Sequence, residues 1–301
     1  MKLHGALLAL LAGLPGTPAL ADDGSMRAIG MDTSFSTDAD NTDVLKVGLN
    51  LDWSHESPEK YAGMRIEKAW FDPLGQGWRA RERAYVRAAD SLGGWKWNGT
   101  AGTDGHTLLG SAGLHDEARF RKEFFVEREM LETPESLKRG IYYSLAGAAI
   151  DLPADDRNIL TLVAGVQDFT GDNVRTLLRA NFIHVLKPDS GLSLQLRTRY
   201  FHDSDPREFD YYSPRWYAQA VPILQLRRFS HGWRYLLAGG IGVQRDSGSG
   251  WRRSTYFNAQ VTSPPKRGWS GSASVLFSET PSATGNSYSY AQLTFALVRA
   301  F

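Results

Sequence analysis

Hydrophobic and polar residues alternate along most of this chain, and the alternation is clearest at its C-terminal end. In the segment 289–301 the odd positions carry Leu293, Phe295, Leu297 and Phe301, and the even positions carry Gln292, Thr294, Ala296 and Ala300. Successive side chains of a β-strand point to opposite faces, so this strand has one apolar face and one polar face. Such a strand is typical of a membrane β-barrel, in which lipid covers one face and a lumen the other.

Fifteen further segments show the same two-residue period. They span residues 25–36, 43–54, 60–70, 76–89, 93–103, 106–115, 117–131, 138–151, 157–168, 173–187, 191–202, 215–228, 232–245, 251–263 and 266–278, and the final strand covers 287–301. Most are longer than an ordinary soluble strand of about five or six residues. A tilted strand needs about nine to eleven residues to cross a bilayer, so these lengths favour a membrane barrel over a soluble sandwich.

No window of a dozen residues keeps a helical period with capping residues at its ends. The pattern therefore predicts an all-β fold, a transmembrane antiparallel up-and-down β-barrel of about sixteen strands. The segments 93–103 and 106–115 are rich in glycine and polar residues, so fourteen strands is the alternative. We expect the first strand, 25–36, to pair with the final strand, 287–301, and close the cylinder.

Short and long connections alternate between the predicted strands. The short turns include 188–191, 230–232 and 264–266, and the longer polar connections include 203–214, 246–250 and 279–286. In bacterial outer-membrane barrels the short turns face the periplasm and the longer loops face the outside. We therefore expect the final strand to run toward the periplasm.

The N-terminal residues have the pattern of a secretory signal. A positively charged start precedes the apolar run 6–12, and residues 19–21 form a small-residue cleavage site. Pro15 interrupts the apolar run well before the roughly twenty residues that a membrane anchor requires. We expect a cleaved signal peptide over residues 1–21 and one barrel domain over 22–301, located in the bacterial outer membrane and surrounded by its lipid.

Composition supports this class and removes others. Aromatic residues make up 12% of the chain and include nine Trp, as expected if they form girdles at the two membrane interfaces. The chain has no cysteine, which removes thiol catalysis, and a formal net charge of +1 gives no electrostatic footprint for nucleic acid. The histidines lie in no catalytic or metal-binding spacing, so we expect no enzyme activity, cofactor or metal site.

Several long polar side chains occupy the polar face of two neighbouring segments. They are Arg175 and Arg179 on 173–187, and Gln195, Arg197 and Arg199 on 191–202. An arginine on the lipid face at the bilayer midplane would cost about 2–4 kcal/mol, so we assign these side chains to the lumen as candidate pore-lining residues.

A lumen rich in arginine needs counter-charge. Carboxylates occur at inward positions of the predicted strands, namely Asp32, Asp52, Glu67, Glu123, Glu127 and Glu129. Two interpretations remain open. The charges form a lattice of ion pairs that stiffens the wall, or the arginines form a basic track that guides an anionic or hydroxyl-rich ligand.

Two charged residues fall on the lipid face. Glu82 is predicted to mark a β-bulge that changes the register, which makes the inward assignment of Arg83 and Arg87 uncertain. Arg299 lies next to the C-terminal residue, where its long side chain can reach the lipid headgroups.

Three stretches in the second half of the chain, 165–175, 200–203 and 211–217, have the sequences GVQDFTGDNVR, YFHD and YYSPRWY. They resemble the C-terminal porin domain of bacterial exopolysaccharide secretion proteins, the cellulose and poly-N-acetylglucosamine export porins. The most specific part is the loop signature Tyr211, Tyr212, Ser213 and Pro214. Pro214 has a fixed φ and no N–H, so it can end the external loop and start the next strand.

The resemblance implies a sixteen-stranded outer-membrane pore for the passive export of an extracellular polysaccharide. It also implies that Phe301 is the recognition point for the barrel-assembly machinery. The chain contains no tetratricopeptide segment, so we expect another protein to supply a periplasmic scaffold. The alternatives are a structural or assembly-associated outer-membrane protein with a plugged lumen and a general small-solute porin.

Overall fold

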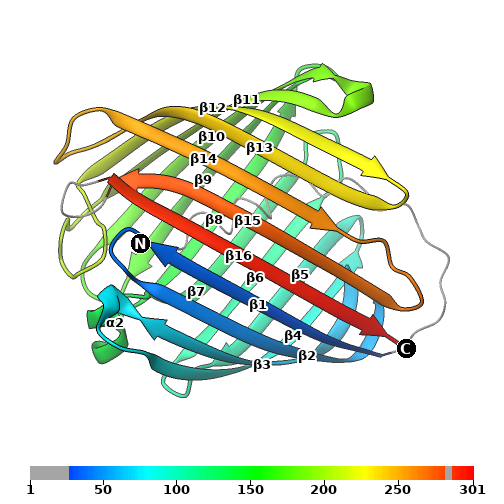
Figure 1. Ribbon diagram of the computed structural model, residues 1–301, viewed down its shortest axis with the longest axis horizontal. Coiled ribbons are helices and arrows are strands. Elements are labelled where there is room, and N and C mark those ends of the chain that lie inside the picture. The colour runs from blue at the N-terminus through cyan, green and yellow to red at the C-terminus, as the bar shows by residue number, and fades with distance from the viewer. Residues whose placement is uncertain (1–26, 282–286) are drawn as a thin grey trace.

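The computed structural model describes residues 27–281 and 287–301, and these form a closed barrel of sixteen antiparallel β-strands (Figure 1). Each strand pairs with its neighbours in the sequence, and β1 pairs with β16 to close the ring. The prediction of an all-β up-and-down barrel with sixteen strands is confirmed, and the alternative of fourteen is wrong.

The first eight strands are β1 (Ala28–Asp38), β2 (Asp43–Ser57), β3 (Lys60–Asp72), β4 (Arg79–Leu92), β5 (Trp95–Thr103), β6 (Leu108–Asp116), β7 (Lys122–Met130) and β8 (Tyr142–Pro153). The others are β9 (Asn158–Phe169), β10 (Val174–Lys187), β11 (Leu192–Asp203), β12 (Trp216–Ser230), β13 (Trp233–Asp246), β14 (Arg252–Thr262), β15 (Trp269–Pro281) and β16 (Ser287–Ala300). Three short helices lie in connections: η1 (Pro73–Gly75), α2 (Pro134–Arg139) and η2 (Pro188–Ser190).

The first and last strands, β1 and β16, pair with each other as predicted. Ala28 lies opposite Ala300, and Asp38 lies opposite Tyr290, in a register without a bulge. A closed ring leaves no edge strand with unpaired backbone groups, which is the condition for a β-structure surrounded by hydrocarbon. The signal peptide prediction for 1–21 and the start of the predicted first strand lie outside the described residues.

The connections divide between two ends of the barrel. The end that carries the C-terminus, called here the C-terminal end, has the short turns 188–191 and 231–232 (Figure 1). The opposite end, called the α2 end, has the longest connections, 131–141 and 204–215. The short turns and long loops therefore separate as the sequence pattern predicted. The last predicted long connection, 279–286, lies partly outside the described residues.

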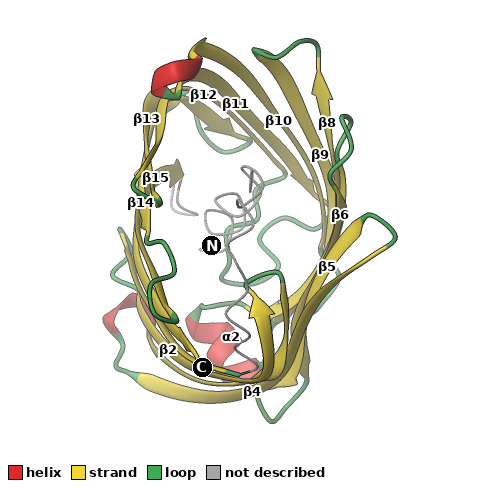
Figure 2. Ribbon diagram, turned by 90° about the vertical axis from the view of Figure 1, so that its right-hand side faces the viewer, coloured by secondary structure: helices red, strands yellow, loops and turns green. Residues whose placement is uncertain are grey.

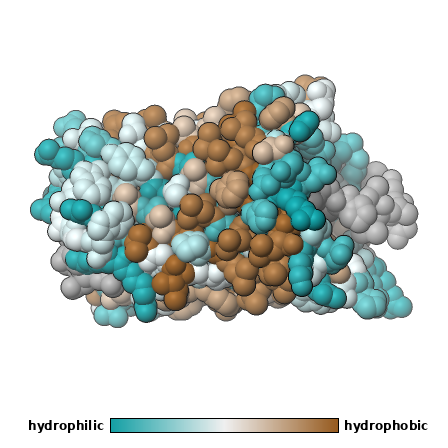
Figure 3. Space-filling model, turned by 90° about the horizontal axis from the view of Figure 1, so that it is seen from above, coloured by the Kyte–Doolittle hydropathy of each residue, from teal (hydrophilic) through white to brown (hydrophobic). Residues whose placement is uncertain are grey.

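The outer surface carries an apolar belt. Large apolar side chains are exposed at outward positions on β1 to β7 and β9 to β16, among them Ile29, Ile66, Val86, Leu162, Leu178, Leu196, Leu224, Val275 and Phe295. Figure 3 shows these residue types across the middle of the molecule, with hydrophilic residues at both ends. Soluble monomers rarely expose an apolar patch of more than a few hundred Å², so a belt of this extent fits a barrel surrounded by lipid. No helix among the described residues has both the length and the apolar character that a membrane crossing requires.

The predicted bulge at Glu82 is wrong. The β3–β4 register runs without a shift from Phe71 opposite Arg79 to Tyr61 opposite Ala89. Glu82 does point outward, and its Oε1 lies 2.9 Å from Nζ of Lys68, its direct cross-strand partner. The position is close to the start of β4 and both side chains are exposed, so the pair keeps its charges near water and needs no change of register.

Arg299 also points outward, as expected. Its guanidinium lies 5.1 Å from the ring centre of Trp269, which is directly opposite on β15. The arginine and the aromatic ring together lie at the C-terminal end of the barrel, where an amphipathic pair suits a membrane interface.

Local sequence signals explain α2, which the sequence pattern did not predict. Thr133 is the N-cap, and its Oγ1 accepts a hydrogen bond from the N–H of Ser136 at 3.2 Å. Pro134 occupies the first helical position, and Gly140 ends the helix with φ of 73°. The helix has only six residues, so its helical period is too short to be recognised in a window of a dozen residues.

Candidate functional site

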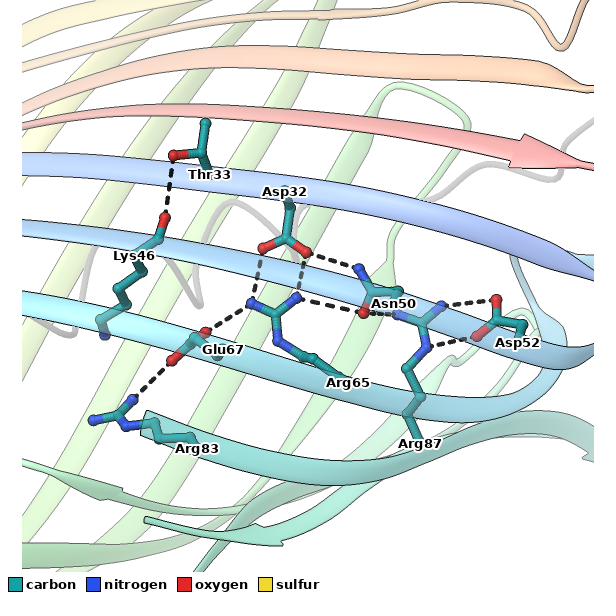
Figure 4. A network of polar contacts seen from close by, with 9 residues as sticks. All are labelled: Asp32, Thr33, Lys46, Asn50, Asp52, Arg65, Glu67, Arg83 and Arg87. Carbon is teal, nitrogen blue, oxygen red and sulfur yellow. Dashed lines mark hydrogen bonds and ion pairs between the residues drawn. The ribbon is translucent and has the colours of Figure 1, made fainter. Parts of the chain in front are cut away.

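One side of the lumen carries a chain of ion pairs. Arg65 on β3 points inward and donates through Nη2 to Asp32 Oδ2 on β1 at 2.8 Å and to Glu67 Oε2 at 2.7 Å (Figure 4). Glu67 also accepts from Nη1 of Arg83 on β4 at 3.1 Å. Arg83 continues the chain to Glu129 on β7, with 2.9 Å between Nη2 and Oε1.

A second group extends the chain toward the C-terminal end. Arg87 on β4 donates to both carboxylate oxygens of Asp52 on β2, through Nε at 3.0 Å and Nη2 at 3.1 Å. Asp52 also contacts Nδ1 of His55 at 2.9 Å, and the Arg87 guanidinium lies 4.3 Å from the ring centre of Tyr61. Arg83 and Arg87 are therefore inward, and their charges are paired.

We call this surface, the inner face of β1 to β4 with β7, the ion-paired wall. Every inward carboxylate that the sequence indicated lies on it: Asp32, Asp52, Glu67, Glu123, Glu127 and Glu129. The last three line a small cavity of about 360 Å³ together with Arg65 and Arg83. On this side of the barrel, the interpretation as an ion-pair lattice applies.

The opposite side of the lumen has a different arrangement. We call the inner face of β10 and β11 the arginine wall, because it carries Arg179, Arg197 and Arg199; β11 lies eight strands from β3 around the ring. Within residues 27–281 and 287–301, no carboxylate lies within ion-pair distance of these three guanidinium groups. For this wall the second interpretation, a basic track that guides a ligand, stays a prediction.

Polar contacts hold the arginine wall in place. Arg197 donates to Oε1 of Gln195 through Nε at 3.3 Å and Nη2 at 3.2 Å, and its guanidinium lies 4.8 Å from the ring centre of Tyr256 on β14. Arg179 lies directly opposite Arg199 in the β10–β11 register. Like charges at directly opposed positions repel each other, so this pair creates a local excess of positive charge.

A cavity of about 610 Å³ lies against this wall. It is lined by residues of β8 to β12, β14 and β15 and of the turn 188–191, and four of the five predicted pore-lining residues border it: Arg179, Gln195, Arg197 and Arg199. Two carboxylates, Asp151 and Asp189, also border the cavity. Asp151 accepts a hydrogen bond from Oγ1 of Thr161 at 2.5 Å. Because guanidinium, amide and hydroxyl groups share this surface, it can bind both anions and hydroxyl groups.

The fifth predicted residue, Arg175, lies apart from the cavity and is fully buried. It donates to Asp203 through Nε at 2.8 Å and Nη2 at 3.2 Å, and both side chains are 0% exposed. Its guanidinium lies between the rings of Phe169 and Phe201, at 5.2 Å and 4.3 Å from their centres. Asp203 is its direct cross-strand partner, so the register supplies a counter-ion that the other arginines of this wall lack.

The loop signature folds into the barrel. Its residues are Tyr211, Tyr212, Ser213 and Pro214, and the first three are buried. The Tyr211 ring stacks on Phe169 with 4.6 Å between centres, and the Tyr212 hydroxyl donates to Asp246 Oδ2 at 2.7 Å. Burial raises the pKa of the Tyr212 phenol, so it remains a donor at neutral pH. The carbonyl of Tyr212 accepts from Nη2 of Arg175 at 2.7 Å, so the buried arginine anchors this loop.

The α2 helix also lies inside the ring of strands (Figure 2). Leu137 is buried against the inner face of the barrel in a cluster with Val44 and Phe71. The helix C-terminus is fixed by Arg81, whose Nη2 donates to the carbonyl of Leu137 at 2.7 Å. Asp210, in the 204–215 loop, joins the two inward segments, since its carboxylate accepts from Thr133 Oγ1 at 2.6 Å and from the Glu135 N–H at 2.8 Å. Together they narrow the lumen at the α2 end.

Sequence reasoning missed Asp210 because its role depends on contacts between connections 75 or more residues apart. It also missed Gln225, an inward residue of β12 that borders the large cavity. The alternation of Gln225 between Leu224 and Leu226 was a usable signal for the second omission. No group of three or more His, Cys, Asp or Glu residues in the described ranges is arranged to hold a metal ion.

Replacing Asp210 by Ala should loosen the narrowing at the α2 end. The substitution removes two hydrogen bonds at the N-terminus of a six-residue helix, and loss of a capping contact of this kind costs about 1 kcal/mol. We expect larger or more frequent openings in single-channel recordings from planar bilayers. Asp205→Ala is the matched control, because this exposed residue of the same loop makes neither contact. Equal channel behaviour in both variants would contradict the link.

No protein-family model and no curated protein matches the sequence. Among solved structures, a bacterial polysaccharide outer membrane secretin superimposes with a TM-score of 0.69 and 14% identity, over 93% of this chain and 100% of that chain. The fold is that of an outer-membrane β-barrel. OprD of Pseudomonas aeruginosa matches with a TM-score of 0.47, 10% identity and coverage of 95% and 100%. OmpT of Vibrio cholerae matches with a TM-score of 0.46, 9% identity and coverage of 94% and 99%.

This outer-membrane barrel resembles the secretin over nearly its whole length, which agrees with the resemblance found in the sequence. At 14% identity the likeness concerns the fold.

Proposed function

We propose that this chain is an outer-membrane pore through which an extracellular polysaccharide is exported passively. The observation that carries the proposal is the cavity of about 610 Å³ on the arginine wall, where Arg179, Arg197 and Arg199 have no carboxylate partner among the described residues. Hydrogen-bond donors that are not used in the wall are available to a passing ligand. The fold shared with a polysaccharide secretin supports the same conclusion.

The direction of transport follows from the proposed orientation. The α2 end, with its longer loops, faces the outside, and the C-terminal end faces the periplasm. We propose that the polymer is driven from the inner membrane and that a separate periplasmic scaffold delivers it. The Phe301 side chain is 62% exposed at the C-terminal end, where the barrel-assembly machinery can recognise it during insertion.

Reconstitution tests this function directly. Purified protein in planar bilayers should give single-channel currents, and deletion of the gene should reduce the polysaccharide on the cell surface. If neither the wild type nor a variant with a shortened 204–215 loop gives a current, the proposed pore function is wrong. Unchanged surface polysaccharide in the deletion strain would leave a pore but contradict export.

A structural barrel with a plugged lumen is the second candidate. It is favoured by α2 and the 204–215 loop, which fold inward and are joined through Asp210. This candidate requires that the narrowing be permanent, whereas export requires that it open. Single-channel recording of Asp210→Ala distinguishes the plugged barrel from the export pore. A permanently plugged barrel should give no current in the Asp210→Ala or the Asp205→Ala variant.

A further inference from the structure

We propose that the arginine wall selects an anionic glycan, a polysaccharide chain that bears carboxylate groups. The inference deepens the proposed function and rests on it for the passage of the polymer. Its starting point is the contrast between the two walls. Arg65, Arg83 and Arg87 each have a carboxylate within 3.1 Å, whereas the three guanidinium groups of the arginine wall have none in the described part of the chain.

The first step of the argument is electrostatic. Arg179 and Arg199 lie directly opposite each other, and Arg197 lies two residues before Arg199 on the same inner face of β11. Three like charges on two adjacent strands repel each other unless an anion lies between them. The carboxylates that border the same cavity, Asp151 and Asp189, make no ion pair with these three arginines. A carboxylate from outside the protein would therefore relieve the repulsion among these three arginines.

The second step concerns geometry. A guanidinium is planar and can donate two parallel hydrogen bonds to one carboxylate. The contacts of Arg197 with Gln195 and the Tyr256 ring fix the plane of that group, so little conformational freedom is lost when a carboxylate binds. Arg179 contributes a buried Nε without a hydrogen-bond partner among the described residues.

The third step points to a sugar and not to a small anion. Asn181 Oδ1 and Gln225 Oε1, which lie in residues that border the cavity, are buried acceptors without a partner in the described ranges. A buried acceptor without a donor costs free energy, and a hydroxyl group would satisfy it. Carboxylate sites and hydroxyl sites on one surface match a chain of acidic sugars. A cationic glycan would meet the arginines with like charge and would be excluded.

Three oligosaccharides with the same β-1,4-linked backbone test the selection. They are an oligoglucuronate, a neutral cello-oligosaccharide and a cationic glucosamine oligosaccharide, each of six sugars. Binding to the detergent-solubilised full-length protein is measured by calorimetry at two salt concentrations. We expect the oligoglucuronate to bind about tenfold or more tightly than the neutral chain, and this preference should shrink as salt is added. Equal binding of the anionic and neutral chains would overturn the inference.

A pair of double variants locates the effect. Arg197→Gln with Arg199→Gln should abolish most of the preference for the oligoglucuronate. Arg245→Gln with Arg253→Gln is the matched control, since these two arginines point outward near the α2 end and border neither cavity. Heat-modifiable migration on SDS gels verifies that each variant is folded. If the lumenal variant does not fold, the comparison of the three oligosaccharides on the wild type still decides the inference.

Three further outcomes separate this inference from the proposed function. Equal blocking of single-channel currents by glucuronate monomer and oligomer would show a site for small anions and would overturn selection of a glycan. Tight binding of the oligoglucuronate without passage of any oligosaccharide across liposomes would support the selective site and contradict export. Passage of all three oligosaccharides at equal rates, with equal affinities, would keep a pore and remove the selectivity.

Discussion

Replacing Asp203 by Ala is expected to lower the free energy of unfolding by about 3–5 kcal/mol, the cost of leaving a buried charge without its partner. The charge concerned is Arg175, which is fully buried and held between two phenylalanine rings. The same substitution removes a hydrogen bond from Nδ2 of Asn173 at 3.0 Å. The measurement is the urea midpoint of the barrel in lipid vesicles, followed by heat-modifiable migration on SDS gels.

Two further variants define the cause of this effect. Glu82→Ala is the matched control, because it breaks an ion pair whose side chains are 45% and 76% exposed, and such pairs contribute about 0–1 kcal/mol. Arg175→Met with Asp203→Leu should regain most of the lost stability, since apolar side chains of similar volume can replace a buried pair. An Asp203→Ala variant as stable as the wild type would show that the pair does not anchor the loop.

Replacing Leu162 by Arg should lower the free energy of unfolding by about 2–4 kcal/mol, because the charge would lie in the hydrocarbon. Leu162 is an outward residue of β9 in the apolar belt, between Ile150 on β8 and Ala180 on β10. The expected effect is a lower urea midpoint and a smaller fraction of folded protein after refolding into vesicles.

The neighbouring residue gives the control for this second prediction. Thr161→Arg places the same side chain one position earlier on β9, where it points into the large cavity beside Asp151. An arginine there can reach both water and a carboxylate, so we expect a much smaller loss of stability than for Leu162→Arg. Equal losses for the two substitutions would mean that the apolar belt does not contact lipid.

The two walls of the lumen use their charged side chains differently. On the ion-paired wall the charges of Arg65, Arg83 and Arg87 are used within the protein. On the arginine wall Arg179, Arg197 and Arg199 have no carboxylate partner among the described residues. The charges of the ion-paired wall are paired within the protein, and this is consistent with a rigid frame around a proposed binding surface on the arginine wall. The substitutions at Arg197 and Arg199 test this difference between the two walls.

Much of the fold was predictable because strand periodicity is a local property. The alternation along 191–202 assigned Arg197 and Arg199 to the inside, and the belt of outward leucines followed from the same period. The closing strand pair was predictable for a related reason, since a barrel in lipid cannot leave an edge unpaired. The predicted bulge at Glu82 failed because a cross-strand lysine, which local periodicity does not reveal, offsets its charge.

The sequence by itself determined the class of fold and the face on which most side chains lie, because a two-residue period acts within one strand. The exact number of strands and the inward position of Arg83 and Arg87 came from the tertiary structure. Only the tertiary structure decided which charges meet. Arg175 and Arg179 share one face of β10, yet the register places an aspartate opposite the first and an arginine opposite the second. Register, closure and the contact of Asp210 with α2 join residues far apart in the chain, and such contacts are fixed only when the whole barrel is assembled.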